Sequence, residues 1–457
     1  MKIIPRTYQD KAVHELRVSF RKNRSVLYVL PTGGGKTMVY ALIASGAIEK
    51  GNRVIVSVHR QELLRQIVKN LADIDIPCGV ITAKNTTEGL IQVASTQTLV
   101  KRLDQIEPPR LLICEEAHHS VNATNRKIID SWPETQVLGV TATPERLDGT
   151  GLGVVYHEMI IGPSVVELQE QGFLAKMRYF VPPPVAQLEG LKLVAGDYEK
   201  QEVAIRMDKP HVTGDAIDHY LKLGNAQRAI VFCTSIKHAE QVAAAFRARH
   251  VPAASIDGTM SEAERRQKIA DLEAGKLYVL TSCELIGEGL DIPAVGVAIL
   301  LRPTASLVFH LQAIGRAMRP AVGKEYGIVI DHVGNCLRHG PAELEREWSL
   351  VGAKRAKKSA NESVPLYRRC PKCFAMFPSA KSHCPQCGTE GVKSRAEIKQ
   401  IEGELKEAEI ASLKFAATSE RKAAKTLEEL VALGIKRGYK NPHGWANHVY
   451  YGRQRQG

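Results

Sequence analysis

Short apolar runs recur along the first 165 residues, separated by stretches long enough for a helix each. They read SVLYVL, RVIVSV, IQVAS, RLLIC and QVLGVTAT. Apolar runs of this length, with little polar alternation, are typical of strands buried on both faces of a parallel sheet. The pattern therefore predicts an open α/β sheet over residues 25–165.

The pattern restarts at residue 228, with the runs RAIVFC, AASID, YVLTS, VAILL and GIVIDH. The stretch between the two series, RYFVPPPVAQLEGLKLVAGDYEK, has weak periodicity and much Pro and Gly, so we expect a linker with a short insertion. The sequence thus predicts two α/β lobes with parallel sheets, over residues 1–170 and 171–335.

Three further segments follow the second lobe. A basic connection containing VGAKRAKKSANES occupies residues 336–365, and a cysteine cluster occupies residues 366–392. Residues 393–457 are rich in Ala, Glu, Lys and Leu, which are strong helix formers, so we expect a helical C-terminal region.

Composition agrees with a multi-domain globular chain. At 457 residues it is too long for one core. Its apolar content of 44% and charged content of 24% are those of a soluble protein. The longest apolar runs are too short to span a bilayer, and the N-terminus lacks the pattern of a signal peptide. We therefore expect a cytoplasmic protein without a membrane partner.

The net charge of +13 is concentrated in the tail. From Cys336 onward, 23 Lys and Arg face 13 Asp and Glu, against 39 and 36 before it. A basic tail on a near-neutral body favours a polyanion such as nucleic acid, although a solvated basic surface is an equal alternative.

Four of the nine cysteines form two closely spaced pairs, CPKC and CPQC. In a chain without a secretion signal, this spacing favours a metal over disulfides. Four thiolates complete the closed tetrahedral shell of structural zinc. The predicted ligands are Cys370, Cys373, Cys384 and Cys387.

A glycine-rich loop, PTGGGKT, lies between the first apolar run and a helical stretch. Its backbone N–H groups can surround phosphate oxygens, Lys36 can reach the β- and γ-phosphates, and the Thr37 hydroxyl can coordinate Mg²⁺. A strict Walker A loop would begin with Gly at position 30, where this chain has Leu30.

The run LLICEEAHHS places Glu115 and Glu116 directly after an apolar strand. A nucleotide-hydrolysing lobe usually carries Asp-Glu-Ala-His at this point. Either the longer first carboxylate serves, or the ATPase site is degenerate, or the similarity is chance.

Segments in the order and at the spacing of the superfamily 2 helicases, with DEAD- or DEAH-box-like motifs, follow one another over some 310 residues, and the resemblance is to that family. The segments are RTYQDKAV, the phosphate loop with EEAH, SVHRQELLRQ, ASTQTL, TAT, VLTSCELIGEGLDIP and HLQAIGRAMRP. The resemblance implies two tandem RecA-like lobes that bind ATP and Mg²⁺ and move along nucleic acid.

The resemblance also implies individual roles. The catalytic residues would be Lys36, Glu115, Glu116, Gln312, Arg316 and Arg319. Residues holding ATP would be Arg6, Gln9, Thr32, Gly33, Gly34, Gly35, Lys36, Thr37, Gly289 and Asp291. Mg²⁺ would be held by Thr37 and Glu115. Nucleic acid would contact His59, Arg60, Thr96, Gln97 and Thr281.

In this family the first acidic residue of the box holds Mg²⁺ and the second polarises the attacking water. Glu115 carries the charge of Asp on a stem one methylene longer, so a small adjustment of rotamer or water would let it serve. Because Lys36, Glu116 and both arginines are present, we expect an active site.

Finer features, TATPERLDG, VIDHVGNCLRHGP and the C-terminal cysteine pairs, resemble the RadD-type DNA repair helicases of bacteria and phages. That resemblance implies DNA, single-stranded or branched, as the partner. It also implies repair or replication proteins, such as a single-stranded-DNA-binding protein, as further partners. An RNA helicase and a nucleic-acid-binding scaffold with a vestigial ATPase site stay open as alternatives.

The C-terminal tail mixes cations with aromatic residues, which suits phosphate contact and base stacking. The alternative is a small helical cap whose aromatic residues form a core. The residues concerned are Lys436, Arg437, Tyr439, Lys440, Trp445 and Arg453.

Overall fold

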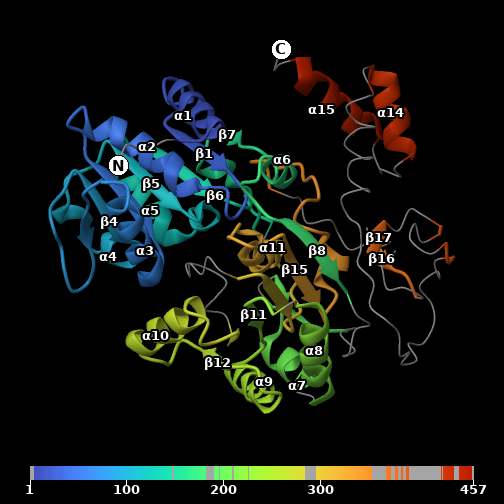
Figure 1. Cartoon of the computed structure of the whole chain (residues 1–457). Coiled ribbons are helices and arrows are strands. Elements are labelled where there is room, and N and C mark those ends of the chain that lie inside the picture. The colour runs from blue at the N-terminus through green and yellow to red at the C-terminus, as the bar shows by residue number, and fades with distance from the viewer. Residues whose placement is uncertain are drawn as a thin grey trace. The chain divides into compact units, whose positions relative to one another are not determined.

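The computed structural model (Figure 1) describes most of the chain. The described residues are 5–146, 149–181, 190–194, 196–207, 210–224, 226–283, 295–352, 367–371, 376–378, 382–383, 388–390, 424, 426–436 and 442–454. The chain divides into two compact units. The first comprises Met1–Met177, Pro184–Asn335 and Glu345–Glu362, and the second Arg178–Pro183, Cys336–Leu344 and Ser363–Gly457.

A seven-stranded parallel sheet forms the first lobe, with the strand order β3-β4-β2-β5-β6-β1-β7. Its central strands are buried along their whole length, as their unbroken Val, Ile and Leu runs predict. The strands are β1 (Ser25–Val29), β2 (Val54–Val58), β3 (Gly79–Ile81), β4 (Ile91–Ser95), β5 (Leu111–Glu115), β6 (Gln136–Thr141) and β7 (Glu158–Ile161).

Helices connect these strands in the alternation that parallel pairing requires. They are α1 (Thr7–Ser19), α2 (Lys36–Ile48), α3 (Gln61–Ala72), α4 (Thr96–Leu99), α5 (Ala123–Ser131) and α6 (Val165–Glu170). Three 3₁₀ turns add η1 (Leu103–Gln105), η2 (Ala117–His119) and η3 (Leu152–Val154). Because all seven strands run the same way, the segments that follow β1, β2, β4, β5 and β6 meet at one edge of the sheet, where open α/β sheets bind ligands.

The second lobe is a six-stranded sheet with the order β12-β13-β11-β14-β15-β8. Its strands are β8 (Lys176–Phe180), β11 (Ala229–Phe232), β12 (Ala253–Ile256), β13 (Val279–Ser282), β14 (Val297–Leu300) and β15 (Tyr326–Asp331). The accompanying helices are α7 (Lys200–Met207), α8 (Pro210–Leu223), α9 (Ile236–Ala248), α10 (Glu262–Glu273) and α11 (Leu307–Gly315), which continues into the 3₁₀ turn η4 (Arg316–Met318). The predicted pair of parallel-sheet lobes is confirmed.

The stretch between the two strand series differs from the expected linker. Its first residues, Arg178–Phe180, complete β8, where Tyr179 and Phe180 are buried. Residues 193–198 form a two-stranded hairpin of β9 (Leu193–Val194) and β10 (Asp197–Tyr198). The Pro and Gly residues that follow β8 hide its short alternation of polar and apolar positions in the sequence.

The structure also describes part of the expected basic connection. Beyond the second lobe, α12 (Asn335–His339) contains the fully buried Cys336. Residues 348–352 return to the first lobe, where Trp348 and Leu350 pack against its core and the Gly153 N–H donates to the Leu350 carbonyl oxygen at 2.9 Å.

The second unit holds the hairpin β16 (Tyr367–Arg369) and β17 (Met376–Pro378), with helices α14 (Leu427–Lys436) and α15 (Pro442–Gln454). The two helices share a small core of Leu430, Leu433 and Ala446, against which Trp445 and Tyr450 pack. This arrangement favours the helical cap for Trp445, while Arg437, Tyr439 and Lys440 lie outside the described residues, as does most of the region 393–426. No helix within the described ranges is long and apolar enough to cross a membrane.

Candidate active site

The phosphate loop joins β1 to the N-terminus of α2. Gly33 and Gly35 have φ values of 82° and 84°, which favour glycine. A Cβ on Gly34 would lie 2.8 Å from the Leu30 side chain, and one on Gly35 would lie 2.7 Å from Gln9 Nε2. The three glycines are therefore needed by the backbone, and the loop leads into a helix whose first N–H groups suit an anion.

The first turn of α1 and its N-cap residue Arg6 contact this loop. The Tyr8 hydroxyl donates to the Gly34 carbonyl oxygen at 2.6 Å, and Gln9 Nε2 donates to that of Gly35 at 3.4 Å. The Gln9 amide oxygen accepts from the Arg6 N–H at 2.9 Å. Arg6 lies 4.1 Å above the ring of Phe173, which also contacts Tyr8 edge-on. Arg6 and Gln9 thus lie beside the loop as the resemblance implies.

The two acidic residues lie where β5 ends. Glu115 is the last residue of β5, and Glu116 has a left-handed backbone with φ of 50°, which is uncommon for a residue with a side chain. The sharp turn at Glu116 directs consecutive carboxylates to the edge of the sheet. Glu115 Oε2 is buried and has no hydrogen-bond partner, so it has an acceptor position to offer a cation.

The charges around the loop perturb one another. Burial raises the pKa of Glu115 to about 8, an effect reinforced by the neighbouring Glu116 charge and opposed by Lys36. Burial lowers the pKa of Lys36, and Glu116 and Glu115 oppose this while Arg319 and Arg316 add to it. The five side chains therefore form one electrostatic cluster.

Motif VI of the second lobe, Gln312–Arg319, meets the phosphate loop and the acidic pair. Gln312 Nε2 donates to Glu116 Oε1 at 3.4 Å. A Cβ on Gly315 would lie 2.8 Å from Thr32, and one on Gly33 would lie 3.7 Å from the Arg319 side chain. Both lobes thus contribute residues to one site, as the resemblance implies.

Lys36 Nζ itself donates to the Leu30 carbonyl oxygen at 3.2 Å, beside the loop that it would serve. Thr37 follows it in the first turn of α2. With the orphaned oxygen of Glu115, these residues fit an ATP–Mg²⁺ pair. Thr37 and Glu115 would hold the metal and Lys36 the phosphates.

A series of three histidines extends from Glu116 across the first lobe. His118 Nδ1 lies 3.4 Å from Glu116 Oε2 and 3.3 Å from the hydroxyl of Thr141, the first residue of the segment TAT. The rings of His118 and His119 are 4.2 Å apart, and those of His119 and His59 are 4.7 Å apart. His59 lies in the segment predicted to bind nucleic acid, so packed side chains connect the two predicted sites.

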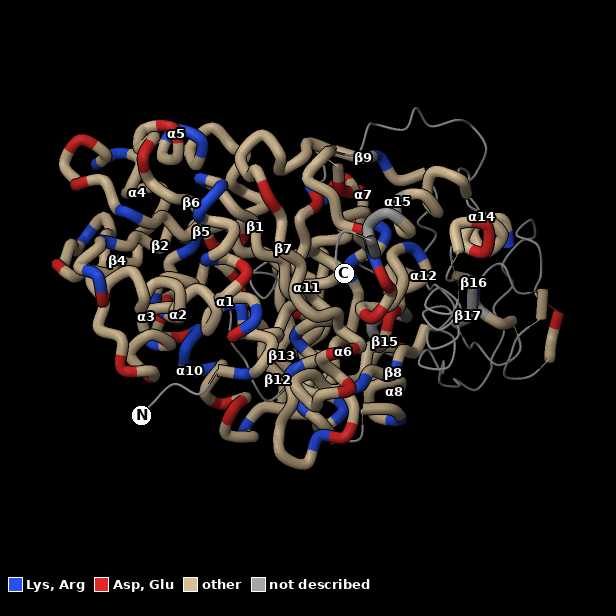
Figure 2. The backbone as a smooth tube through the Cα atoms, turned by 90° about the horizontal axis from the view of Figure 1, so that it is seen from above, with Lys and Arg blue, Asp and Glu red and all other residues tan. Residues whose placement is uncertain are grey.

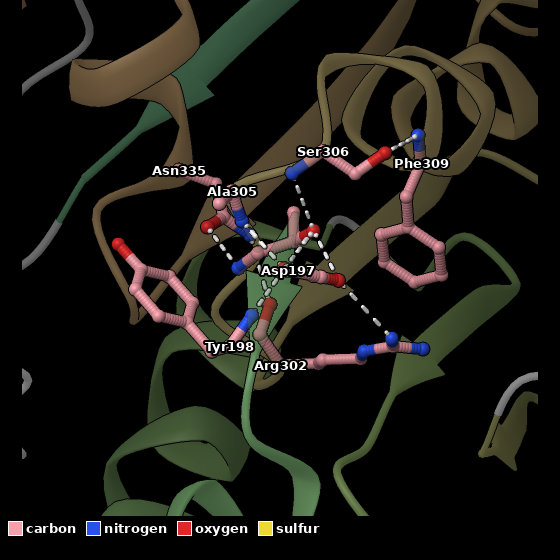
Figure 3. Close-up of polar contacts among 8 residues, drawn as sticks. Asp197, Tyr198, Arg302, Ala305, Ser306, Phe309 and Asn335 are labelled. Carbon is pink, nitrogen blue, oxygen red and sulfur yellow. Dashed lines mark hydrogen bonds and ion pairs between the residues drawn. The ribbon is translucent and has the colours of Figure 1, made fainter. Parts of the chain in front are cut away.

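The start of α11 is fixed by Asp197 of the β9–β10 hairpin (Figure 3). Asp197 accepts hydrogen bonds from the Ala305 N–H at 2.7 Å and the Thr304 hydroxyl at 3.0 Å, and Arg302 NH2 lies 3.4 Å away. The Ser306 hydroxyl caps the helix by accepting from the Phe309 N–H. These contacts set the position from which α11 extends to the arginines of motif VI.

Basic and acidic residues are interspersed over both lobes (Figure 2). Crossed ion pairs join α3 to α10, with Arg265 2.8 Å from Glu62 and Arg65 in contact with Glu262. Because α3 directly follows His59 and Arg60, the pairs link the lobes beside the predicted nucleic-acid segment.

Two of the residues predicted to contact nucleic acid have buried side chains. Thr96 is buried and its hydroxyl is hydrogen-bonded to that of Ser57 at 2.9 Å. Thr281 is fully buried in β13 and donates to the Ala239 carbonyl oxygen at 2.7 Å. Thr281 points into the lobe because of its position in the alternation of β13, and Thr96 is buried at the first residue of α4. Gln97 is exposed, and His59 and Arg60 are partly exposed, so their assignment stays a prediction.

Several predicted residues lie outside the described part of the chain. They are Gly289 and Asp291 of the segment VLTSCELIGEGLDIP, together with Cys373, Cys384 and Cys387. Cys370 is described. It is buried, forms no disulfide and directly follows β16.

Sequence reasoning missed Phe173, Asp197 and His119 as parts of the site. Phe173 and Asp197 lie in segments without strong periodicity, so only the pairing of a short hairpin could have indicated Asp197. His119 stands next to the acidic box, and its adjacency to His118 was the available signal.

Two family models match the chain. Residues 2–146 match the model described as Type III restriction enzyme, res subunit, and residues 213–321 match the model described as Helicase conserved C-terminal domain. The two matches cover the phosphate loop with the acidic pair, and motif VI, respectively.

Relatives and solved structures agree with these models. A 51.5 kDa protein of a Lactococcus phage is 32% identical over 87% of this chain and 86% of its own length. The DNA 3'-5' translocase XPB2 of Sulfurisphaera tokodaii is 26% identical over 70% of this chain and 79% of its own length. A Saccharomyces cerevisiae Dbp5 variant bound to RNA and ADP BeF3 shares the fold, with a TM-score of 0.51 at 15% identity over 71% of this chain and 87% of that one.

Other relatives are longer than this chain. It spans 51%, 57% and 60% of the helicase-named proteins of Saccharomyces cerevisiae, Schizosaccharomyces pombe and a Sulfolobus islandicus filamentous virus.

The raised pKa of Glu115 predicts a stability change in Glu115→Gln. The folded protein binds this proton more tightly than the unfolded chain, so the group's contribution to stability is complete below pH 4.5 and is lost as the pH rises to about 8. A glutamine does not titrate and escapes this loss. Without nucleotide or Mg²⁺, we expect Glu115→Gln to match the parent in Tm at pH 5. At pH 8 it should exceed the parent by about 2–4 °C, which corresponds to roughly 1 kcal/mol.

Thermal melts of the exposed control Glu88→Gln should show no such dependence on pH. A Tm for Glu115→Gln that falls relative to the parent between pH 5 and pH 8 would contradict the buried, destabilised carboxylate.

Proposed function

Because the chain belongs to the superfamily 2 helicases, which hydrolyse ATP, we propose that it is a nucleic-acid-stimulated translocase acting on DNA in repair, recombination or replication. The observation that supports this most directly is the assembly of one site from two lobes, in which Gln312 donates to Glu116 and Gly315 packs against Thr32.

In the proposed mechanism, Lys36 binds the β- and γ-phosphates and Glu116 polarises the attacking water. Mg²⁺, held by Thr37 and Glu115, would neutralise charge on the phosphates. Arg316 and Arg319 act from the second lobe as arginine fingers on the charge that develops at the γ-phosphate. Because these residues come from both lobes, hydrolysis changes how strongly the lobes are held together.

Hydrolysis is transmitted to nucleic acid by two routes, one within the first lobe and one between the two lobes. The series His118, His119 and His59 leads from Glu116 to the segment that we assign to the strand, together with Arg60 and Gln97. The α3–α10 ion pairs follow that segment, so a change at the lobe interface also moves its helix. The protein would then bind the nucleic-acid strand tightly in one nucleotide state and release it in the other.

DNA is favoured as the substrate by the restriction-enzyme family model, the relative named a DNA translocase and the basic C-terminal region. The RadD-type assignment, with a single-stranded-DNA-binding protein as a partner, rests on the short segments that carry that resemblance. An RNA helicase is the second candidate, because the Dbp5 structure with RNA shares the fold. In addition, motifs that contact the phosphate backbone do not distinguish RNA from DNA.

We further propose that the four clustered cysteines hold one structural zinc ion. Cys370 follows β16, Cys373 lies in the connection to β17, and a β-bridge between His383 and Glu390 flanks the second pair. Strand pairing on either side of each cysteine pair is consistent with two knuckles that present their thiolates to one metal.

The substrate is tested by ATP turnover with single-stranded DNA, forked DNA and RNA of matched length. We expect single-stranded or forked DNA to raise kcat at least tenfold more than RNA does. Lys36→Ala and Arg319→Ala should lose at least about 100-fold in kcat on the best substrate, because both act on transition-state charge.

Stronger stimulation by RNA would replace the DNA assignment with an RNA helicase. ATP binding without turnover on every nucleic acid would identify a scaffold. Normal kcat in Arg319→Ala would contradict the arginine-finger assignment.

Zinc is tested by elemental analysis of protein purified without chelators. We expect one zinc per chain, and its loss in Cys370→Ser/Cys387→Ser but not in the single-cysteine control Cys78→Ser. Protein that folds and contains no zinc would contradict the proposal.

A further inference from the structure

Lys324 has an unusual set of partners just beyond motif VI. Its ammonium donates to the carbonyl oxygens of Val295 at 2.8 Å, Ala317 at 2.7 Å and Arg319 at 2.7 Å. Three hydrogen bonds use all three donors of an ammonium group. Two of the acceptors belong to the segment that carries the proposed arginine fingers.

That segment cannot satisfy its own carbonyl groups. The turn η4 ends at Met318, and Arg319 has an extended backbone with φ of −67° and ψ of 131°. The last carbonyl oxygens of a helix lack partners within it. The Lys324 ammonium donates to the carbonyl oxygens of Ala317 and Arg319. The Ala175 N–H donates to the Met318 carbonyl oxygen at 2.8 Å. Three consecutive carbonyls are thereby fixed from two directions.

The third acceptor connects the segment to the sheet of the second lobe. Val295 is buried and lies two residues before β14. One ammonium therefore ties the end of motif VI to the base of a central strand. Retaining a charge there is costly, since burial and the nearby Arg319 charge lower the pKa of Lys324 to about 8.

We propose that Lys324 is a positioning residue that sets where Arg316 and Arg319 meet the γ-phosphate. This inference rests on the proposed role of the arginines. Asp197 fixes the start of α11 and Lys324 fixes the end of η4, so both ends of the element are held. A reacting group displaced by about 1 Å can cost about 100-fold in rate, which is why backbone placement matters at this distance from the chemistry.

The test compares Lys324→Met with Lys268→Met. Lys268 is the matched control, because it also donates to a backbone carbonyl of the second lobe, that of Ser255 at 3.0 Å, and lies on α10 away from motif VI. With saturating DNA, we expect Lys324→Met to lower kcat about tenfold or more while the affinity for ATP changes less than threefold. Lys268→Met should keep kcat within twofold of the parent.

Lys324→Arg keeps the charge and provides a variant that folds if the methionine does not. Its rigid guanidinium cannot reproduce the three bonds, so kcat should lie between those of the parent and Lys324→Met. Thermal melts establish that each variant is folded at the assay temperature.

A double-mutant comparison identifies the route of the effect. In an Arg316→Ala/Arg319→Ala background, Lys324→Met should lower kcat less than threefold, because both fingers that it positions are gone. An equal loss in both backgrounds, or normal kcat in folded Lys324→Met and Lys324→Arg, would overturn the proposal. Normal kcat in Arg319→Ala alone would instead overturn the proposed finger.

Discussion

Five ionisable side chains surround the phosphate loop, with Arg316 buried and the other four half-buried, and the arrangement of both lobes depends on them. Lys36 and the two arginines of motif VI balance Glu115 and Glu116, which lie on consecutive residues of a strained turn. Buried charge is tolerated only when it is compensated. The raised pKa of Glu115 shows that compensation is incomplete, and a nucleotide with a divalent cation supplies the missing anionic and cationic groups.

The second lobe matters because of where it places motif VI. The hairpin with Asp197 sits at the start of α11, while Lys324 and the Ala175 N–H hold the end of η4. The two residues before Ala175 contact the first lobe. Leu174 lies against Gly33. Phe173 contacts Arg6 and Tyr8. The segment that joins the lobes thus contacts the phosphate loop, the N-terminal end of α1 and the arginine segment. Such shared contacts let one binding event bias the whole interface.

The sequence was sufficient for the two-lobe architecture, because buried parallel strands have strong local signatures. A glycine-rich loop has such a signature too, and the predicted nucleotide site rests on it. The sequence failed where a side chain's direction depends on tertiary packing. Thr96 and Thr281 belong to motif segments yet turn their hydroxyls inward, to Ser57 and the Ala239 carbonyl. Asp197 acts on a residue 108 positions away, and Lys324 acts on carbonyl groups 5, 7 and 29 positions away. No periodicity marks either set of partners. The strand β8 was hidden for a different reason, since Pro-rich sequence follows directly after it.

A cysteine pair tests directly whether both lobes build one nucleotide site. A Cβ at residue 315 would lie 2.8 Å from Thr32, so a shift of about 1 Å brings Thr32→Cys/Gly315→Cys into the range of a disulfide. Under mild oxidation, peptide mapping by mass spectrometry should find residues 32 and 315 linked. The control Thr32→Cys/Gly258→Cys should give no such link, because no atom, and therefore not Thr32, lies within 4 Å of a Cβ at Gly258. Failure of folded Thr32→Cys/Gly315→Cys to form the link, with or without ATP, would contradict the shared site.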